Sequence, residues 1–361
     1  MALCAKCTFT RRVKTPPRSA TGKSRHSTLI AQLPSTTLHP FMKNNSFLLS
    51  TISAALFASR LAACDLCPCD LPAMDFKSAA GWHVRVSEQF THFGTLQMDN
   101  FTIANPAGEY LDSSITQLII GYDFSRALGV QLGVPLMHRS FQRWKNGALE
   151  TGSVSGVGDV SFLAHWAPIH LVRSDFLVAV RFSAGLSLPT GDSSRVHEEA
   201  ADGGGEGEAP AMASGIHGHD LALGTGSVSG LFGVDARVQW KRLFVTAGLA
   251  GTARTKGAHG YTFADEMSFH GSLGAFLVDG DDFNLSLAAE CNGSSKGQDV
   301  FQGVRATDTS ATVVYLGPQI SANWAKRYHA EVGVQFPVLR ENSGVQAMPD
   351  YRVSATFGVR F

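Results

Sequence analysis

Hydrophobic and polar residues alternate along the chain from Trp82 to its end, with a period of two residues. In the stretch that follows Ser174, Phe176 and Val178 share one face, while Arg181 and Ser183 lie on the other. This pattern predicts antiparallel strands that each have one apolar and one polar face. Twelve segments show it: 82–94, 115–124, 127–139, 157–167, 175–189, 225–240, 242–254, 266–278, 282–292, 309–324, 326–339 and 350–361.

The lengths of these segments and of their connections indicate a membrane barrel. Many segments have eleven to sixteen residues, whereas strands of soluble proteins usually have about five or six and a tilted membrane strand needs about nine to eleven. Connections after even-numbered segments are short, and those after odd-numbered segments are long and polar. Short turns at one end and long loops at the other are typical of outer-membrane proteins. We therefore predict an all-β fold, a transmembrane antiparallel up-and-down β-barrel of about twelve strands with periplasmic ends.

Aromatic residues mark the predicted periplasmic ends of the strands. One begins the first strand and the others end strands two, four, six, ten and twelve: Trp82, Phe124, Trp166, Trp240, Trp324 and Phe361. Four of the five tryptophans thus fall at one edge of the predicted span, as an interfacial aromatic girdle requires.

The composition agrees with a barrel and excludes other classes. Only 17% of the residues are charged, 44% are hydrophobic and 37 are glycine, so the chain is not disordered and is poorer in charge than average soluble proteins. No stretch reaches the roughly 18 uninterrupted apolar residues that a membrane-spanning helix needs. The 30 Lys and Arg balance 30 Asp and Glu, and this balance argues against a nucleic-acid partner.

The charge is unevenly distributed, which predicts a processed leader. Residues 1–63 hold nine Lys or Arg and no acid, which leaves 21 basic and 30 acidic residues beyond them. Residues 42–63 have a basic start, a short apolar core and small residues before Cys64, and we interpret them as a secretory signal peptide. Residues 1–41 are then a disordered basic extension from a start codon placed too early; an organellar transit peptide is the alternative.

Cysteines cluster in the segment 64–81, directly after the predicted cleavage site, as Cys64, Cys67 and Cys69. In an exported protein the simplest interpretation is a disulfide or a lipid anchor. The sequence Leu-Ala-Ala-Cys resembles a lipobox, so lipidation of Cys64 and ordinary signal cleavage are both open. A soft-metal or redox site is a further alternative, although three thiolates fall short of the usual four ligands.

The polar faces of the strands are expected to line the lumen of the barrel, residues 82–361. Their small polar residues and scattered charges are expected of a channel or a plugged pore. These charges either meet a passing solute or pair with each other and fill the interior. The charged candidates for the lumen are Arg85, Arg139, Asp159, Arg181, Arg237, Arg254, Glu290, Glu331 and Arg352.

Three short motifs give the chain a resemblance to a known family. They are G-V-G-D-V-S at 156–161, L-P-T-G-D at 188–192 and L-G-T-G-S at 223–227. In this order they resemble the outer-membrane proteins grouped with the phenol-degradation meta-pathway transporters. The resemblance implies a barrel over residues 82–361 that moves small hydrophobic or aromatic molecules, and a terminal Phe361 that the barrel assembly machinery recognises.

The connection between Gly191 and Leu223 is the longest and is rich in histidine and acids. His197, His217 and His219 are candidate metal ligands, because His-x-His is a plausible chelating pair and neighbouring acids could add oxygen ligands. A flexible polar outer loop is the simpler interpretation. No other cofactor is expected.

No enzyme motif is present, since the chain has neither a Gly-x-Ser-x-Gly elbow nor a His-Glu-x-x-His helix. We therefore expect a non-enzymatic, porin-like transporter for passive passage of small molecules. It would lie among the outer-membrane lipids of a Gram-negative-type bacterium. The alternatives are an outer-membrane barrel hydrolase and a lipidated metal-binding or sensory surface protein.

Overall fold

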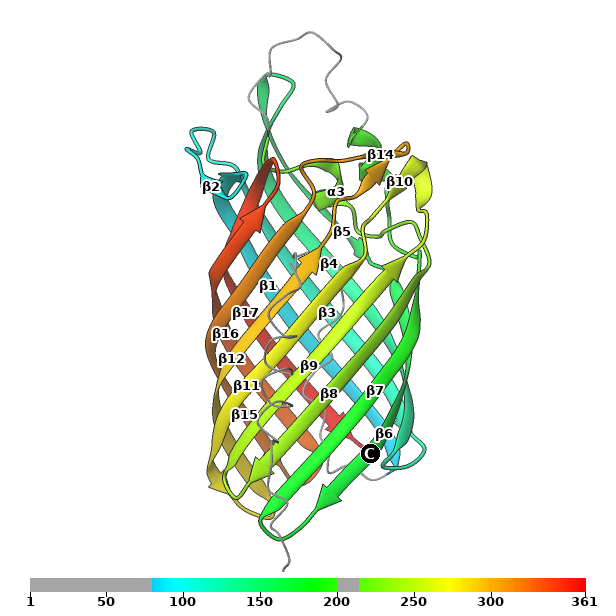
Figure 1. Cartoon of the computed structure of the whole chain (residues 1–361), viewed down its shortest axis with the longest axis vertical. Helices are drawn as coiled ribbons and strands as arrows, with labels where there is room; N and C mark the ends of the chain where they lie inside the picture. Colours follow the sequence, from blue (N-terminus) through cyan, green and yellow to red (C-terminus); the bar gives the residue numbers. More distant parts are fainter. Residues whose placement is uncertain (1–79, 200–213) are drawn as a thin grey trace, which may run out of the picture. The chain divides into compact units, whose positions relative to one another are not determined.

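Twelve long strands form a closed antiparallel barrel in the computed structural model, which describes residues 80–199 and 214–361 (Figure 1). The predicted extension, signal peptide and cysteine cluster lie outside these ranges, so they remain predictions. Within the two ranges, no helix has the length and apolar character needed to cross a membrane.

The barrel strands follow one another around the wall in chain order, each antiparallel to the next. β17 also pairs with β1, with Val353 opposite Phe90, and this pairing closes the sheet. Closure leaves no strand edge with unpaired backbone groups, which is the condition for strands to cross lipid. The strands are β1 (Gly81–Met98), β3 (Tyr110–Asp123), β4 (Leu128–Lys145), β6 (Val160–Val172), β7 (Phe176–Leu188), β8 (Ser229–Trp240), β9 (Leu243–Arg254), β11 (Glu266–Asp279), β12 (Phe283–Lys296), β15 (Ala311–Trp324), β16 (Tyr328–Asn342) and β17 (Val345–Arg360).

Shorter elements occupy the long connections, at the upper end of Figure 1. β5 pairs with β4, so the second long connection is a hairpin that continues the wall. β10, β13 and β14 form a separate three-stranded sheet. The elements are β2 (Phe101–Thr102), β5 (Ala148–Val157), η1 (Ser194–Glu198), α3 (Gly218–Leu221), η2 (Ala258–Gly260), β10 (Tyr261–Thr262), β13 (Val300–Phe301) and β14 (Val304–Arg305).

The twelve predicted strands are confirmed, but two predicted long loops, 140–156 and 340–349, are largely hairpins instead. The pattern places a loop between residues 339 and 350, whereas β16 and β17 extend and meet in a turn at Ser343–Gly344. Gly344 has a φ of +62°, which glycine adopts without steric cost. The end of β16, residues 340–342, is polar on both faces, and the start of β17 carries apolar residues on both faces, as Ala347 and Met348 show. Alternation, the signal that identifies strands, is therefore missing.

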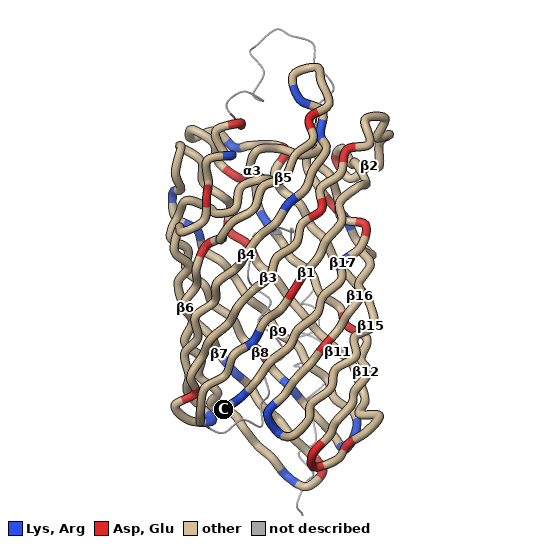
Figure 2. The backbone as a smooth tube through the Cα atoms, turned by 180° about the vertical axis from the view of Figure 1, so that it is seen from behind, with Lys and Arg blue, Asp and Glu red and all other residues tan. Residues whose placement is uncertain are grey.

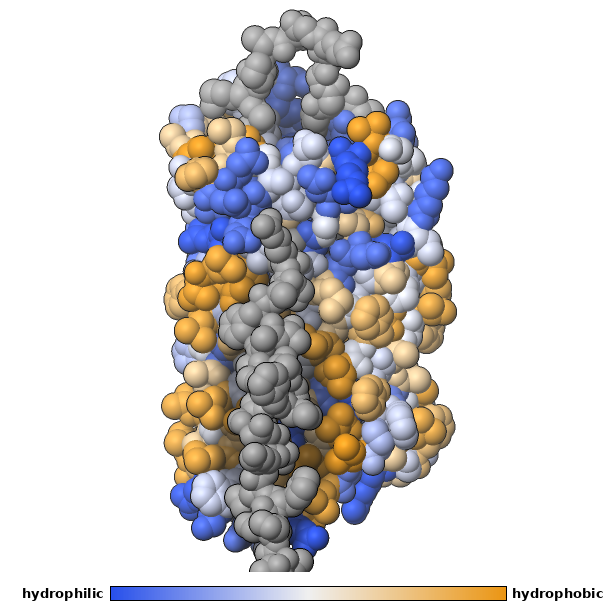
Figure 3. Space-filling model, in the orientation of Figure 1, coloured by the Kyte–Doolittle hydropathy of each residue, from blue (hydrophilic) through white to orange (hydrophobic). Residues whose placement is uncertain are grey.

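The outward faces of the strands are apolar and exposed. Trp82, Trp166 and Trp240 are 56%, 55% and 59% exposed, and Phe124 and Phe361 of the same predicted girdle are exposed as well. Figure 3 shows hydrophobic residues over the middle of the visible face and hydrophilic residues toward both ends. Charged residues likewise gather mainly near the two ends (Figure 2). This surface is that of a barrel that spans a bilayer.

The inward faces are buried and more polar. In β7, Arg181, Ser183 and Ser187 are buried, while Phe182 and Leu186 on the opposite face are exposed. The predicted assignment of polar faces to the lumen therefore holds for this strand. The barrel wall thus presents its charges to the interior, where they contact one another and the loops that fold inward.

Candidate functional site

The longest loop folds into one mouth of the barrel instead of remaining a flexible outer loop. Ile216 and Leu221 are at most 1% exposed, and they pack against Leu111 of β3 and Phe141 of β4. Both wall residues lie on the inward faces of their strands. The described parts of the loop, residues 193–199 and 214–222, are therefore called the plug. Burial of its few apolar residues stabilises a fold that its polar composition alone does not predict.

Buried polar groups of the wall hold the plug in position. Glu109, which is 3% exposed, accepts hydrogen bonds from the amide of Gly215 at 3.0 Å and the hydroxyl of Ser214 at 2.7 Å. Arg139, which is 1% exposed, donates to the backbone carbonyl of Asp220. Hydrogen bonds to charged groups contribute about 1.5–3 kcal/mol each, so these contacts favour the docked plug.

A second anchor holds the η1 end of the plug. The carboxylate of Glu198 accepts hydrogen bonds from Lys145 and Arg143 at 2.5 Å and from Arg195 at 2.7 Å. Burial opposes ionisation of Glu198, but these three cations outweigh burial and lower its pKa to about 2. The carboxylate is therefore ionised at neutral pH and links η1 to the C-terminal end of β4.

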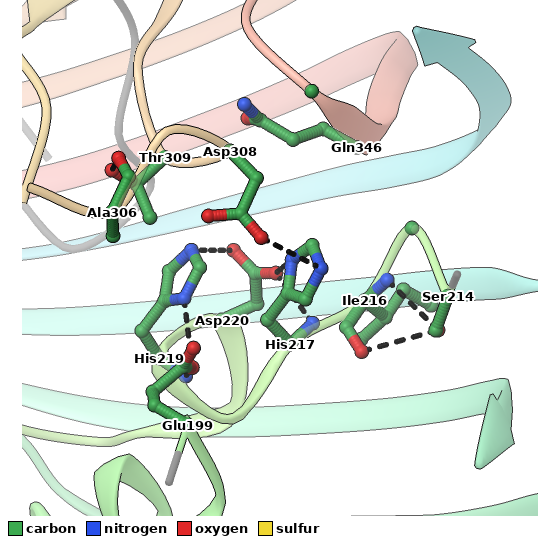
Figure 4. A network of polar contacts seen from close by, with 12 residues as sticks. Glu199, Ser214, Ile216, His217, His219, Asp220, Ala306, Asp308, Thr309 and Gln346 are labelled. Atoms are coloured by element: carbon green, nitrogen blue, oxygen red, sulfur yellow. Dashed lines mark hydrogen bonds and ion pairs between the residues drawn. The ribbon is translucent and has the colours of Figure 1, made fainter. Parts of the chain in front are cut away.

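Two histidines and three carboxylates meet in the plug (Figure 4). The rings of His217 and His219 are stacked, with centroids 5.4 Å and planes 10° apart. Asp220 faces both rings, with Oδ2 3.7 Å from Nδ1 of His217 and Oδ1 3.3 Å from Nε2 of His219. The other ring nitrogens face further acids. Nδ1 of His219 is 2.9 Å from Glu199 Oε1, and Nε2 of His217 is 3.5 Å from Asp308 Oδ2.

The surroundings of His219 favour its charged form. Burial opposes protonation, but the carboxylates of Asp220 and Glu199 outweigh burial and raise the pKa of His219 to about 9. Burial also opposes ionisation of Glu199, but His219 lowers its pKa to about 2. At neutral pH the cluster therefore places a positive charge between two carboxylates.

The other predicted metal ligands do not join this cluster. His197 lies in η1 and packs on His259, with ring centroids 3.7 Å apart. The three predicted cysteine ligands lie outside the described residues. Asp308, which comes from the connection between β14 and β15, is a member that sequence reasoning missed. No sequence signal connects a single acid in a distant loop to the plug.

A pocket of about 720 Å³, its mouth included, lies against the plug. It brings together Arg139 and Arg352, two of the predicted lumen residues, from opposite parts of the sequence. The guanidinium of Arg352 lies 4.1 Å from the centre of the Tyr315 ring. The pocket therefore combines cationic and apolar groups. Its apolar lining includes Phe93, Leu111, Val313 and Met348, and its other charged lining residues are Lys296, His219 and Asp220.

The remaining predicted lumen residues are distributed along the barrel, where they have charged, polar or aromatic neighbours. Arg85 interacts electrostatically with Arg181 and Glu331 from distant strands. The other three also have partners: Glu290 with Gln335 at 2.7 Å, Arg237 with the ring of Phe244 at 4.7 Å, and Arg254 with Glu266 at 2.9 Å. These contacts support the interpretation that the charged side chains interact with neighbouring groups and fill the interior of the barrel.

Asp159 differs from the other candidates, because its hydrogen bonds connect the three glycine-containing motifs. One oxygen of its carboxylate accepts a hydrogen bond from the amide of Gly191 at 2.9 Å. The other oxygen accepts from the amide and the hydroxyl of Thr225 at 2.8 and 2.7 Å. The motifs at 156–161, 188–192 and 223–227 therefore meet at the base of the plug, and Asp159 fixes the two points where the loop leaves the wall.

Replacing Asp159 by alanine should loosen this base. Three hydrogen bonds to a carboxylate would be lost, and the largely buried Thr225 would lose the acceptor of both its amide and its hydroxyl. We expect local protection of the Gly191 and Thr225 amides from hydrogen exchange to fall by about 30-fold or more, since each such bond contributes about 1.5–3 kcal/mol. The control is Asp192→Ala, which removes an acceptor of the exposed Ser194 amide. Equal protection in both variants would contradict the role of Asp159.

A further cluster that sequence reasoning missed lies at the opposite end of the barrel, where the short turns are. Asp123, at the end of β3, has a side chain that is only 6% exposed. Its carboxylate lies 3.0 Å from Nε2 of His165, 3.6 Å from Nδ1 of His83 and 2.5 Å from the guanidinium of Arg360. These groups come from β1, β3, β6 and β17, so the cluster crosses the seam at which the barrel closes.

Comparisons with known proteins agree with the fold. No protein-family model and no curated protein matches the chain. An outer-membrane channel from Pseudomonas putida F1 superposes with a TM-score of 0.57 at 15% identity, covering 82% of this chain and 99% of that one. The β domain of the Bordetella autotransporter BrkA gives a TM-score of 0.39 at 13% identity, covering 79% and 100%. The first comparison shows that this chain has the fold of an outer-membrane β-barrel.

Proposed function

We propose that this protein is an outer-membrane channel for passive passage of small molecules, and that the plug controls passage. One observation carries the proposal: a closed barrel with an apolar exterior and a charged interior holds its longest loop inside one mouth. Neither an energy source nor a catalytic residue is part of this mechanism. A solute would cross by diffusion, with the polar lumen replacing part of its hydration.

The lining of the pocket indicates how solutes are selected. Arg139 and Arg352 lie in the same pocket as several apolar side chains. A solute with an apolar body would displace poorly bound water from such a surface. Together with the resemblance of the three glycine motifs to meta-pathway transporters, this lining favours small hydrophobic or aromatic cargo.

The proposal puts the apolar band of the barrel among the lipids of the outer membrane of a Gram-negative-type bacterium. The fold shared with the Pseudomonas channel supports this location. Phe361 follows the last residue of β17 and is 70% exposed. An exposed terminal aromatic residue at the end of the closing strand is accessible to the barrel assembly machinery, the partner expected from the sequence.

A barrel hydrolase, the principal alternative, would need a nucleophile, a histidine and an orienting group in contact. The pair formed by His138 Nδ1 and Ser155 Oγ, 2.6 Å apart on an exposed face, offers a histidine and a hydroxyl. Within residues 80–199 and 214–361, however, no carboxylate lies within ion-pair distance of His138. This arrangement supports a channel more strongly than an enzyme.

Reconstitution tests the proposed function directly. Untagged protein in planar bilayers should give discrete conductance steps, and proteoliposomes should take up small solutes faster than empty vesicles. A shift in gel mobility on heating shows beforehand that the barrel is folded. Folded protein that gives neither conductance nor solute flux would reject the proposal.

A further inference from the structure

The histidine cluster of the plug has the composition and geometry of a divalent metal site. His217, His219 and Asp220 each offer one ligand atom, and these atoms all lie within 4.8 Å of one another. Both histidines are buried, with side chains that are 8% and 5% exposed. Two imidazoles and one carboxylate are a ligand set that suits zinc in particular.

The carboxylate of Asp220 lies between the two histidines, at distances close to those between ligands of one tetrahedral ion. Ligand atoms about 2.0–2.2 Å from one zinc ion lie about 3.3–3.6 Å from each other. Oδ2 of Asp220 is 3.7 Å from Nδ1 of His217, and Oδ1 of the same carboxylate is 3.3 Å from Nε2 of His219. One ligand atom from each of the three residues lies within 4.8 Å of the others, so a small contraction would bring them to the spacing of a bound ion.

Nδ1 of His217 is the ring nitrogen that faces Asp220. Nδ1 is buried and has no hydrogen-bond partner among the described residues. A buried polar nitrogen without a partner normally costs about 1–3 kcal/mol. A cation at the centre of the cluster would remove this cost by accepting the lone pair of Nδ1.

Each histidine is also oriented by a second carboxylate on its far side. Asp308 faces Nε2 of His217 at 3.5 Å, and Glu199 faces Nδ1 of His219 at 2.9 Å. Histidines that bind metals characteristically donate their other ring N–H to a carboxylate, which fixes the tautomer and strengthens the ligand. Both rings therefore point their remaining nitrogen toward Asp220 and the centre of the cluster.

We propose that the plug binds one zinc-class divalent cation through His217 Nδ1, His219 Nε2 and a carboxylate oxygen of Asp220. Binding would displace the proton that His219 carries at neutral pH without a bound ion, because histidine ligates metals in its neutral form. Three protein ligands leave a fourth position for water. Asp308 belongs to the β14–β15 connection, so the bound ion also ties the plug to a neighbouring loop through His217. The site does not depend on the channel function, because it is defined by the plug alone.

Equilibrium binding of Zn²⁺ to the full chain tests this proposal. The test protein carries no polyhistidine tag, and serine replaces all six cysteines, so that no thiolate competes for the ion. We expect one Zn²⁺ per chain, and visible absorption bands of tetrahedral Co²⁺ when cobalt replaces zinc. Stoichiometric binding should be lost in the double variant His217→Ala/His219→Ala.

Variants outside the ligand set make the result specific. Glu199→Gln and Asp308→Asn keep all three ligands and should weaken binding by about 10- to 100-fold each. His197→Ala and His259→Ala remove a neighbouring histidine pair and should leave affinity unchanged. Heat-modifiable mobility checks that every variant is folded. Binding that survives in the double variant, or no stoichiometric binding to the folded protein, would overturn the proposal.

Discussion

Deleting the plug is expected to raise single-channel conductance by about threefold or more, since a twelve-stranded barrel is near the size at which a loop can still fill the lumen. The deletion is structurally feasible because the two ends of the loop already meet. The amides of Leu223 and Gly224 donate to the carbonyl of Asp192 at 2.9 and 3.1 Å. A short Gly-Ser linker can therefore replace residues 194–221 without moving β7 or β8. Conductance is measured in planar bilayers on protein that shows heat-modifiable mobility.

A matched variant keeps the plug and weakens only its docking. Glu109→Gln preserves the size of the side chain but replaces the charged acceptor of Gly215 and Ser214. We expect brief openings toward the level of the deletion variant, because the docked state loses part of its stabilisation. Asp282→Ala changes an exposed acid at the opposite end and should leave conductance unchanged. Wild-type conductance in the deletion variant would show that the plug does not restrict passage.

The barrel itself could be predicted from the sequence because lipid permits few solutions. Strands that cross a bilayer must close on themselves and must alternate apolar and polar residues along their whole length. The alternation is visible in a segment such as 175–189, and closure follows from the lipid environment that the alternation implies. The turn at Ser343–Gly344 was not predicted, because strand ends that extend beyond the membrane need not alternate apolar and polar residues.

The plug could be predicted only in part. His217 and His219 are conspicuous as a His-x-His pair, but the acids and glycines around them indicate an unfolded loop. What makes the loop fold is burial of Ile216 and Leu221 against Phe141. Two apolar residues in a polar loop carry no recognisable periodicity, and their partner lies in a strand far away in sequence. Tertiary packing therefore decides whether this loop folds, and the sequence pattern alone does not predict that packing.

The cluster around Asp123 escaped prediction for a related reason. His83, His165 and Arg360 lie on three different strands, and only the register of the closed barrel brings them to one carboxylate. One residue of the local sequence, Gly129, is explained by this cluster. A Cβ there would lie 2.4 Å from the Asp123 carboxylate and 2.5 Å from the His165 ring, so only glycine leaves room for both side chains.

Replacing Asp123 by alanine is expected to destabilise the barrel by about 3 kcal/mol or more, because removing one member of a buried ionic network typically costs about 3–5 kcal/mol. The carboxylate is nearly fully buried, and it is shared by His83, His165 and Arg360. His83 and Arg360 are register partners across the β1–β17 seam. Loss of the acid therefore weakens the contact that fixes the closing strands at the end of the barrel that carries the short turns.

Two controls separate this effect from the loss of any acid. Asp123→Asn keeps the volume and one acceptor oxygen, so it should fall between alanine and wild type. Asp282→Ala removes the acid of an exposed pair whose side chains are 88% and 72% exposed, and exposed pairs contribute at most about 1 kcal/mol. Guanidinium unfolding in lipid vesicles, followed by tryptophan fluorescence and gel mobility, gives the free energies. If the Asp123→Ala midpoint matches that of Asp282→Ala, the cluster does not hold the seam, and backbone pairing of β1 with β17 alone must close the barrel.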